Sequence, residues 1–192
     1  KAWADAHPDA KLIQGFGWRY TLFPTTGPTK AELDKLFPDK PVLLVAIDAH
    51  SAWVNSKALE LAGIDAKTPD PAPGVSFFQR DPKTNEPTGW VVETLAEQMV
   101  MAKLNPPTPE AVIAAAAEKF QDFADAGITS VFDAGMGTIP TDWGLAGYQQ
   151  LEREHRLPVR VVGSYYWNNP EVTDPVADVL ALRSKFNSEL VQ

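Results

Sequence analysis

The stretch from Pro41 to Ile64, PVLLVAIDAHSAWVNSKALELAGI, places the tightest constraint on how this chain can fold. Its first seven residues, 41–47, are apolar without a break, as in a central strand that is covered on both faces. Helix formers follow at 57–62, and Gly63 stands where a left-handed residue commonly ends a helix. The pattern therefore predicts a buried strand, a polar corner and a helix, as in an α/β protein.

The polar corner supplies the first candidate site residues. Asp48 and His50 come directly after the predicted strand, followed by Trp53 and Asn55. Ligands of α/β proteins bind at the carboxyl ends of strands, which makes Asp48 and His50 candidates for substrate contact. The alternative is that Asp48 closes a turn or caps the next helix, and that His50 is a hydrogen-bonded structural residue. The spacing alone leaves both interpretations open.

A second candidate pair lies near the beginning of the chain. Residues 12–20, LIQGFGWRY, form a predicted strand whose Gly15 and Gly17 indicate a bulge or a close approach by another group. An arginine beside a tryptophan, as in Trp18-Arg19, can hold an anionic group of a ligand. The alternative is a core tryptophan next to a surface arginine that forms an ion pair.

The second half of the chain alternates helix and strand. Predicted strands at 128–132 and 158–167 are separated by a helix at 143–155, so we expect parallel strands joined by right-handed crossovers. Asp133 follows the first of these strands and is a second acidic residue at a strand's carboxyl end. It is therefore a further candidate catalytic residue.

Between these regions the sequence predicts a hairpin. Residues 75–79 and 89–92 can pair around a connection rich in turn residues. Glu93 then opens a predicted helix whose apolar side includes Leu95 and Met99. The hairpin makes the first half of the chain less regular than the second, and Glu93 is a further polar residue available to a site.

Composition excludes several classes of function. The net charge is −8 and no cluster of lysine and arginine occurs, which argues against nucleic-acid or anionic-membrane partners. Without cysteine, the chain forms no disulfide, thiolate metal site or cysteine nucleophile. No apolar run approaches the roughly 18 residues of a membrane span. The three histidines lack ligand spacing, so we expect no complete metal site from this chain alone.

The run DAHSAWVNSKALELAGI at 48–64, preceded by KPVLLVAI and followed by TPDP and PTGW, resembles the YtcJ-like amidohydrolases (amidohydrolase family 3, AepA-type metal-dependent hydrolases). IQGFGWRY, AGITSVFDAG and LPVRVVGSYYW resemble other strands of that family in the same order. The resemblance implies an α/β fold that is part of a (β/α)8 TIM barrel with a hairpin-containing insertion. Residues 1–107 would hold early barrel strands plus the insertion, and 108–192 would hold βα units of the same larger domain.

The resemblance also implies a chemistry. Family members hydrolyse amide-type C–N bonds other than peptide bonds, with a divalent metal, usually zinc, that activates water. Their metal ligands are an HxH pair, a lysine, two histidines and an aspartate, and no residue of this chain matches them. The chain would therefore be an internal fragment, inactive and without metal by itself. It would supply His50 to orient the substrate, with Trp53 and Asn55 shaping the pocket; Ala49 stands where the family usually has glycine.

The expected partner is a small amide-type substrate, and unpaired strand edges of a partial barrel predict a homodimer. The compartment, cytoplasmic or periplasmic, is not fixed by the sequence. Two other functions compete with the fragment of an amidohydrolase. One is a non-catalytic α/β module for binding or assembly. The other is a metal-free hydrolase, which requires Asp48, His50 and Asp133 within about 3 Å of each other or of one water molecule.

Overall fold

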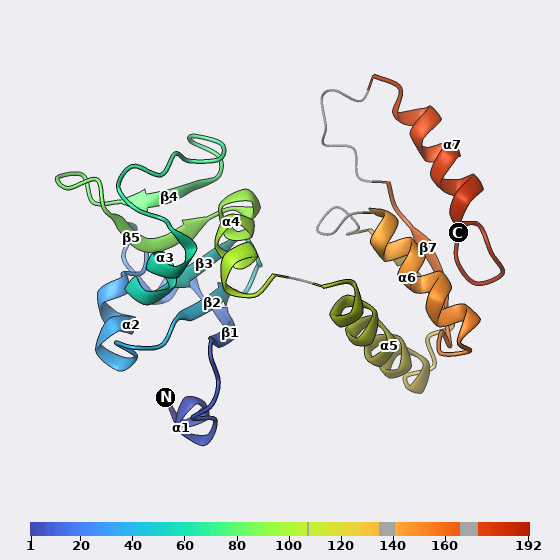
Figure 1. Cartoon of the computed structure of the whole chain (residues 1–192), viewed down its shortest axis with the longest axis horizontal. Coiled ribbons are helices and arrows are strands. Elements are labelled where there is room, and N and C mark those ends of the chain that lie inside the picture. The colour runs from blue at the N-terminus through green and yellow to red at the C-terminus, as the bar shows by residue number, and fades with distance from the viewer. Residues whose placement is uncertain (107, 135–140, 166–172) are drawn as a thin grey trace. The chain divides into compact units, whose positions relative to one another are not determined.

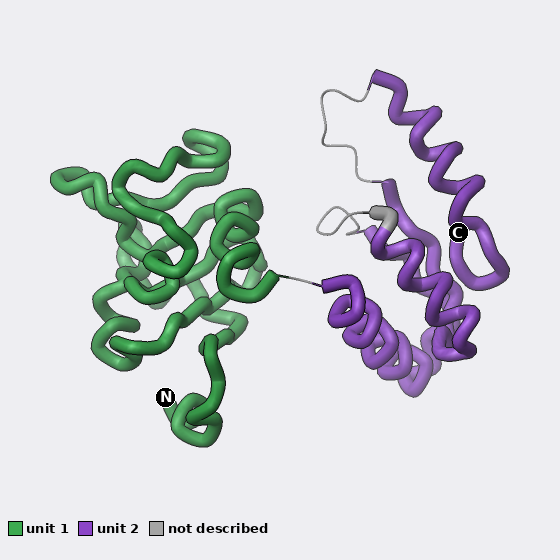
Figure 2. The backbone as a smooth tube through the Cα atoms, in the orientation of Figure 1, with its two compact units in different colours: residues 1–106 green, residues 107–192 purple. Residues whose placement is uncertain are grey.

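A computed structural model describes residues 1–106, 108–134, 141–165 and 173–192 (Figure 1). The chain divides into two compact units, 1–106 and 107–192, coloured green and purple in Figure 2. Each unit has its own hydrophobic core and is described by itself. The assignment of 1–107 to barrel strands plus an insertion, and of 108–192 to barrel units, stays a prediction.

Unit 1 is built on a five-stranded mixed sheet with the strand order β1-β2-β3-β5-β4. Only β1 and β2 are parallel, and the other neighbours are antiparallel. The strands are β1 (Ile13–Trp18), β2 (Val42–Ala46), β3 (Ser51–Val54), β4 (Phe77–Arg80) and β5 (Pro87–Val92). The helices are α1 (Ala2–Ala6), the short 3-10 helix η1 (Tyr20–Leu22), α2 (Lys30–Leu36), α3 (Ser56–Ala62) and α4 (Thr94–Leu104).

The stretch 41–64 corrects the expected sequence of strand, corner and helix. The apolar run forms β2 as predicted, but residues 51–54 form a second strand, β3, that pairs antiparallel with β2 and places Trp53 opposite Leu44. Four residues beginning with a serine give too short a pattern for a strand prediction, and β3 is fixed by its two neighbours, β2 and β5. The helix α3 ends as predicted, with Gly63 at φ 71°.

Other local predictions for unit 1 are confirmed. The hairpin consists of β4 and β5, and the register of β1 against β2 shifts between Phe16 and Trp18, where Gly17 has φ 104°. The predicted apolar side of α4 is confirmed at Met99, which packs against the core, and is wrong at Leu95, which is exposed. The residues that α4 buries are Ala96, Glu97 and Val100, and of these Ala96 and Val100 belong to a core shared with α3 and the sheet.

Unit 2 confirms the predicted parallel pairing. Strand β6 (Ser130–Asp133) lies parallel to β7 (Arg160–Gly163), with helices α5 (Pro109–Asp125), α6 (Thr141–Arg153) and α7 (Pro175–Phe186) around them. Val191 also forms an isolated parallel bridge to Val161 on β7. Phe120 of α5 and residues of α6 pack on the strands and form the core. Residues 166–167 of the strand expected at 158–167 lie outside the described residues.

Candidate functional site

The turn between β2 and β3 holds Asp48 and His50, both exposed to solvent. The Asp48 Oδ1 atom accepts hydrogen bonds from the backbone N–H of His50 at 3.0 Å and from the Tyr20 hydroxyl group at 3.1 Å. The backbone bond is the turn-closing contact that the structural interpretation of Asp48 predicts. The bond to Tyr20 additionally joins this turn to the segment that follows β1.

His50 is paired with Glu93, which lies at the start of α4. Its Nδ1 atom is 2.9 Å from Glu93 Oε2, and the Glu93 backbone N–H donates to the His50 carbonyl oxygen at 2.9 Å. The hydrogen bond to Glu93 and the charge of that carboxylate raise the pKa of His50 above its usual value. The site therefore favours a positively charged imidazole in contact with solvent.

Glu93 has an unusual backbone conformation, with φ 66° and ψ 159°. This region is essentially restricted to glycine, and a non-glycine residue there costs of order 1–3 kcal/mol. The position of Glu93 is imposed by the sheet, because Val92 pairs with Ser51 and so carries Glu93 to the β2–β3 turn. The strain is thus located at the residue that contacts His50.

Glu97 lies one helical turn further along α4 and is 7% exposed. Its Oε1 atom has no hydrogen-bond partner in the described part of the chain. Burial raises the pKa of Glu97 to about 7, and the charge of Glu93 adds to this effect while His50 opposes it. A helix N-terminus normally favours a carboxylate, so burial outweighs the helix dipole here.

Glu97 is not among the site residues predicted from the sequence. The available signal was its spacing, four residues after Glu93 and three before the buried Val100. That spacing places a charged residue on the buried side of the helix.

A cavity of about 340 Å³ with aromatic walls lies next to Tyr20, the residue that bonds Asp48. Trp18, Tyr20, Phe23 and Trp90 line it together with the loop 24–28. Ring centroids are 4.9 Å apart for Trp18 and Tyr20, and 6.4 Å apart for Tyr20 and Trp90. The Trp90 Nε1 atom is buried and, within the described residues, has no hydrogen-bond partner. Tyr20 connects the cavity to Asp48, because its ring lines the former and its hydroxyl group bonds the latter.

The tryptophans and the arginine predicted from sequence have different surroundings. Trp18 lines the cavity and donates its indole N–H to the Leu44 carbonyl oxygen at 2.8 Å. Trp53 donates to the Thr29 carbonyl oxygen at 2.8 Å, and its ring packs against Phe23. Arg19 is exposed and forms no ion pair with any other described residue.

Asn55 is completely buried and caps the N-terminus of α3. Its Oδ1 atom accepts from the backbone N–H groups of Val42 and Ala58 at 2.9 and 3.0 Å. Its Nδ2 atom donates to the carbonyl oxygens of Phe37 and Lys40 at 2.9 and 2.8 Å. All four hydrogen-bonding positions of the amide are taken by backbone, which gives Asn55 a structural role in this unit and leaves no position for a substrate.

Asp133 lies in unit 2, at the carboxyl end of β6. Its Oδ2 atom accepts a hydrogen bond from the Tyr148 hydroxyl group at 2.6 Å, and its carbonyl oxygen accepts from the Ser164 N–H at 2.9 Å. Burial and the neighbouring carboxylate raise the pKa of Tyr148, which stays protonated as the donor. Asp133 belongs to a different unit from Asp48 and His50, so the metal-free arrangement of these three residues stays a prediction.

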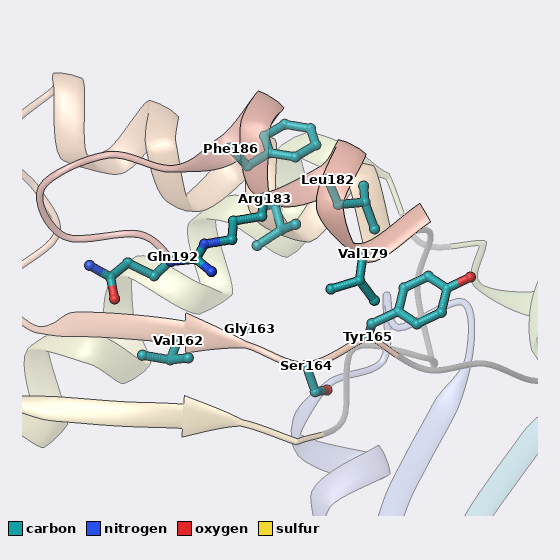
Figure 3. A pocket seen from close by; sticks show the side chains of 10 residues that line it. Val162, Gly163, Ser164, Tyr165, Val179, Leu182, Arg183, Phe186 and Gln192 are labelled. Carbon is teal, nitrogen blue, oxygen red and sulfur yellow. The ribbon is translucent and has the colours of Figure 1, made fainter. Parts of the chain in front are cut away.

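Unit 2 has its own cavity, of about 270 Å³, between β7 and α7 (Figure 3). Val162, Ser164 and Tyr165 line it from the strand and the residues that follow, and α7 contributes Val179, Leu182, Arg183 and Phe186 (Figure 3). The Ser164 hydroxyl group is buried and makes no hydrogen bond to a described residue. This cavity is mainly apolar and lies one strand from Asp133.

The described residues do not form a metal site. In ranges 1–106, 108–134, 141–165 and 173–192, no three imidazole or carboxylate groups come together to hold an ion. The helices of these same ranges are all too short or too polar to cross a membrane.

This chain also matches the model of a known protein family. Residues 1–189 match the model of the amidohydrolase family (Amidohydro_3). Several curated proteins are similar, and three of them are described next. AepA, the exoenzymes regulatory protein of Pectobacterium carotovorum subsp. carotovorum, is 33% identical over 97% of this chain and 40% of AepA. The putative amidohydrolase YtcJ of Bacillus subtilis is 39% identical over 64% of this chain and 22% of YtcJ. The N-substituted formamide deformylase of Arthrobacter pascens is 34% identical over 66% of this chain and 24% of that enzyme.

A solved structure is also similar. An uncharacterized metal-dependent hydrolase from Pyrococcus horikoshii OT3 superimposes with a TM-score of 0.55 and 25% identity, over 95% of this chain and 32% of that protein. The chain thus spans 40% or less of each of these four proteins.

Proposed function

Since this chain belongs to the amidohydrolase family, we propose that it is a segment of a metal-dependent hydrolase that cleaves amide-type C–N bonds other than peptide bonds. The observation that carries the proposal is the family match over residues 1–189. The likeness of 95% of the chain to a metal-dependent hydrolase supports it. The substrate class follows from the family description and from the relative named as a formamide deformylase.

We further propose that the segment forms part of a (β/α)8 barrel. Parallel β6 and β7 and the parallel bridge at Val191, separated by helices, are the repeat from which such barrels are built. The β4–β5 hairpin belongs to the proposed insertion in the first part of the chain. Active sites of these barrels lie at the carboxyl ends of the strands, where Asp133 stands in unit 2.

Within this proposal the chain supplies residues that contact the substrate. His50 is exposed, and its Nδ1–H donates to Glu93, so the neutral ring offers Nε2 to a substrate as an acceptor and the protonated ring offers Nε2–H as a donor. Asp133 would act from the carboxyl end of β6. The described residues do not fit a metal site, so the divalent ion, which we propose to be zinc, would have to be held by the rest of the longer protein.

The test compares this chain with the longer protein of which it is a segment. An N-substituted formamide is the first substrate to assay, with metal content measured on both samples. We expect the longer protein to contain metal and to hydrolyse the amide, and this chain to do neither. Failure of the longer protein to hydrolyse amides, with small-molecule binding retained, would favour the non-catalytic binding module instead.

The role of His50 is tested by His50→Ala in the longer protein. Loss of one substrate hydrogen bond predicts a decrease in kcat/KM of roughly 10- to 100-fold. His155→Ala is the matched control, because His155 lies beyond the end of α6 in unit 2, and kcat/KM should stay within about twofold of the unmodified protein. Equal effects of the two substitutions would contradict the assignment.

A further inference from the structure

The N-terminus of α4 is not capped by its own N-cap residue. Thr94, Leu95 and Ala96 are the first three residues of this helix, and their backbone N–H groups need partners from outside it. The side chain at the N-cap position normally accepts a hydrogen bond from the second or third of these groups. The N-cap residue of α4 is Glu93, whose side chain makes no such bond and instead places its Oε2 atom 2.9 Å from His50 Nδ1.

Ser76, which directly precedes strand β4, supplies this cap from another part of the chain. It is 2% exposed, and its Oγ atom accepts a hydrogen bond from the Ala96 N–H at 2.8 Å. The same hydroxyl group has one proton to donate, with the carbonyl oxygen of Val92 at 3.1 Å and that of Glu93 at 3.2 Å as acceptors. Ser76 therefore bonds the last residue of β5 or the N-cap residue, and the first turn of α4, at the same time.

The β4–β5 hairpin fixes the position of Ser76. The Ser76 N–H donates to the Ala72 carbonyl oxygen at 2.7 Å, and the Ala72 N–H donates to the Ser76 carbonyl oxygen at 3.0 Å. The next residue, Phe77, pairs with Val92 across the two strands, which brings Ser76 beside Glu93, 17 positions later in the chain. The backbone of Ser76 is thus held on both sides, so its hydroxyl group is directed at the start of α4.

The backbone of Glu93 is held at both its N–H and its carbonyl group. The N–H donates to the His50 carbonyl oxygen at 2.9 Å, and the carbonyl oxygen accepts from the Glu97 N–H at 3.2 Å and lies beside Ser76 Oγ. These contacts hold Glu93 at φ 66° and ψ 159°, a conformation that the surrounding structure has to impose. Because Ser76 bonds the Ala96 N–H, the Glu93 carboxylate is available to His50.

From these contacts we infer that Ser76 is a positioning residue of the proposed hydrolase, which replaces the N-cap side chain of α4 and so holds Glu93 against His50. The inference rests on the proposed function, in which His50 contacts the substrate. A carboxylate is a hydrogen-bond acceptor, so Glu93 keeps the proton of the neutral imidazole on Nδ1 and leaves Nε2 to the substrate. Without the Ser76 hydroxyl group, the Glu93 side chain would cap α4 itself and release His50.

The direct test is an NMR titration of the His50 ring protons in the 192-residue chain, with His50→Ala to identify their signals. The hydrogen bond and the charge of Glu93 raise the pKa of His50, so release of Glu93 in Ser76→Ala should lower this pKa. Glu93→Gln removes the carboxylate and sets the scale, and Ser76→Ala should lower the pKa at least half as far. Asp48 and Glu97 also act on His50 but are present in both variants, so the change reports Glu93.

Thr88→Ala is the matched control in the same hairpin. The Thr88 hydroxyl group donates to the Gln79 carbonyl oxygen at 3.1 Å, so this variant loses a bond from hydroxyl to backbone and keeps the one at α4. The pKa of His50 should stay that of the unmodified chain. If Ser76→Ala fails to fold, Ser76→Cys carries the same expectation, because its thiol fills the site and accepts hydrogen bonds only weakly. An unchanged His50 pKa in a folded Ser76 variant, or an equal decrease in Thr88→Ala, would overturn the inference.

In the longer protein the measurement is the pH profile of kcat/KM for an N-substituted formamide. Ser76→Ala should lower kcat/KM about three- to tenfold, less than His50→Ala, and should move the limb of the profile that His50 sets to lower pH. Thr88→Ala should leave both unchanged. An unmoved profile, in a variant whose His50 pKa has fallen, would contradict a role of Ser76 in the reaction. If the unmodified longer protein hydrolysed no amide, the proposed function would fail, while the titration would still decide whether Ser76 holds Glu93.

Discussion

Two helices of unit 1 begin directly after neighbouring strands of the same sheet, and their first turns differ. The helix α3 begins at Asn55, a buried side chain whose four hydrogen-bonding positions all contact backbone groups. The helix α4 begins at Glu93, in a strained conformation, and buries Glu97 with one oxygen atom unpartnered. The N-terminus of α3 is therefore fully hydrogen-bonded, whereas the N-terminus of α4 retains backbone strain at Glu93 and a buried carboxyl group without a counter-charge at Glu97.

The difference has a physical meaning, because both features of α4 cost free energy. A non-glycine residue in the conformation of Glu93 costs of order 1–3 kcal/mol, and a buried polar atom without a partner costs about 1–3 kcal/mol more. The sheet and the α3–α4 core must offset these costs. Strain and unmatched charge cluster at functional sites, and the N-terminus of α4 lies beside His50, whereas the N-terminus of α3 lies at the other end of β3.

The largest expected effect is that of Asn55→Ala. The substitution leaves two N–H groups and two carbonyl groups of the backbone without their buried partner, so we expect unfolding free energy to fall by about 3–5 kcal/mol. Urea denaturation followed by tryptophan fluorescence measures this. Asn105→Ala is the control, because that side chain makes one exposed hydrogen bond of 3.4 Å to Gln14 and its loss should cost less than about 0.5 kcal/mol. If Asn55→Ala lowered the unfolding free energy no more than Asn105→Ala does, the proposed difference between the N-termini of α3 and α4 would be contradicted.

Next in size is the pH dependence contributed by Glu97. Its pKa of about 7 in the folded chain exceeds the ordinary value of 4.5, so the folded state binds this proton more tightly than the unfolded state. That contribution to stability is complete below about pH 4.5 and is lost as the pH rises through about 7. At 1.36 kcal/mol per pKa unit, the full shift corresponds to about 3.4 kcal/mol, and partial solvation of the carboxyl group reduces the expected loss to roughly 1–3 kcal/mol.

The measurement is the unfolding free energy of the unmodified chain and of Glu97→Gln between pH 4 and 9. Asp48, Glu93 and His50 face the same position and are present in both proteins, so the difference between the two curves isolates Glu97. We expect the unmodified chain to lose stability relative to the variant as the pH rises. If the two proteins showed the same dependence of unfolding free energy on pH, the Glu97 carboxyl group would be solvated. The N-terminus of α4 would then no longer differ from that of α3 in burying an unpartnered group.

Much of unit 1 and unit 2 could be predicted because the signals are local. The left-handed Gly63 at the end of α3 and the β4–β5 hairpin are each set by a few neighbouring residues, and both are present in the structure. The parallel strands of unit 2 likewise follow from an alternation that a short window reveals.

The site was harder to predict because it depends on long-range register. Strand β3 was missed, since its pairing with β5 decides its existence more than its own four residues do. That pairing brings Glu93 to His50, 43 positions earlier in the chain, and places Glu97 beside them. The sequence marked Asp48 and His50, but the burial that makes Glu97 unusual arises from the packing of α4 on the sheet, which no local pattern specifies.

The smallest expected effect is that of Glu93→Gly, and it separates strain from charge. Glycine adopts φ 66° without the side-chain clash, which offsets its larger entropy loss on folding, so we expect a gain in stability of about 1 kcal/mol. Ala49→Gly is the matched variant in the β2–β3 turn, where φ is 60°, and should stabilise by a similar or smaller amount. Only Glu93→Gly removes a carboxylate, so it alone should lower the pKa of His50 toward its usual value, which NMR titration measures. A Glu93→Gly variant less stable than the unmodified chain by more than about 1 kcal/mol would mean that the contact with His50 outweighs the strain, and the start of α4 would then resemble that of α3.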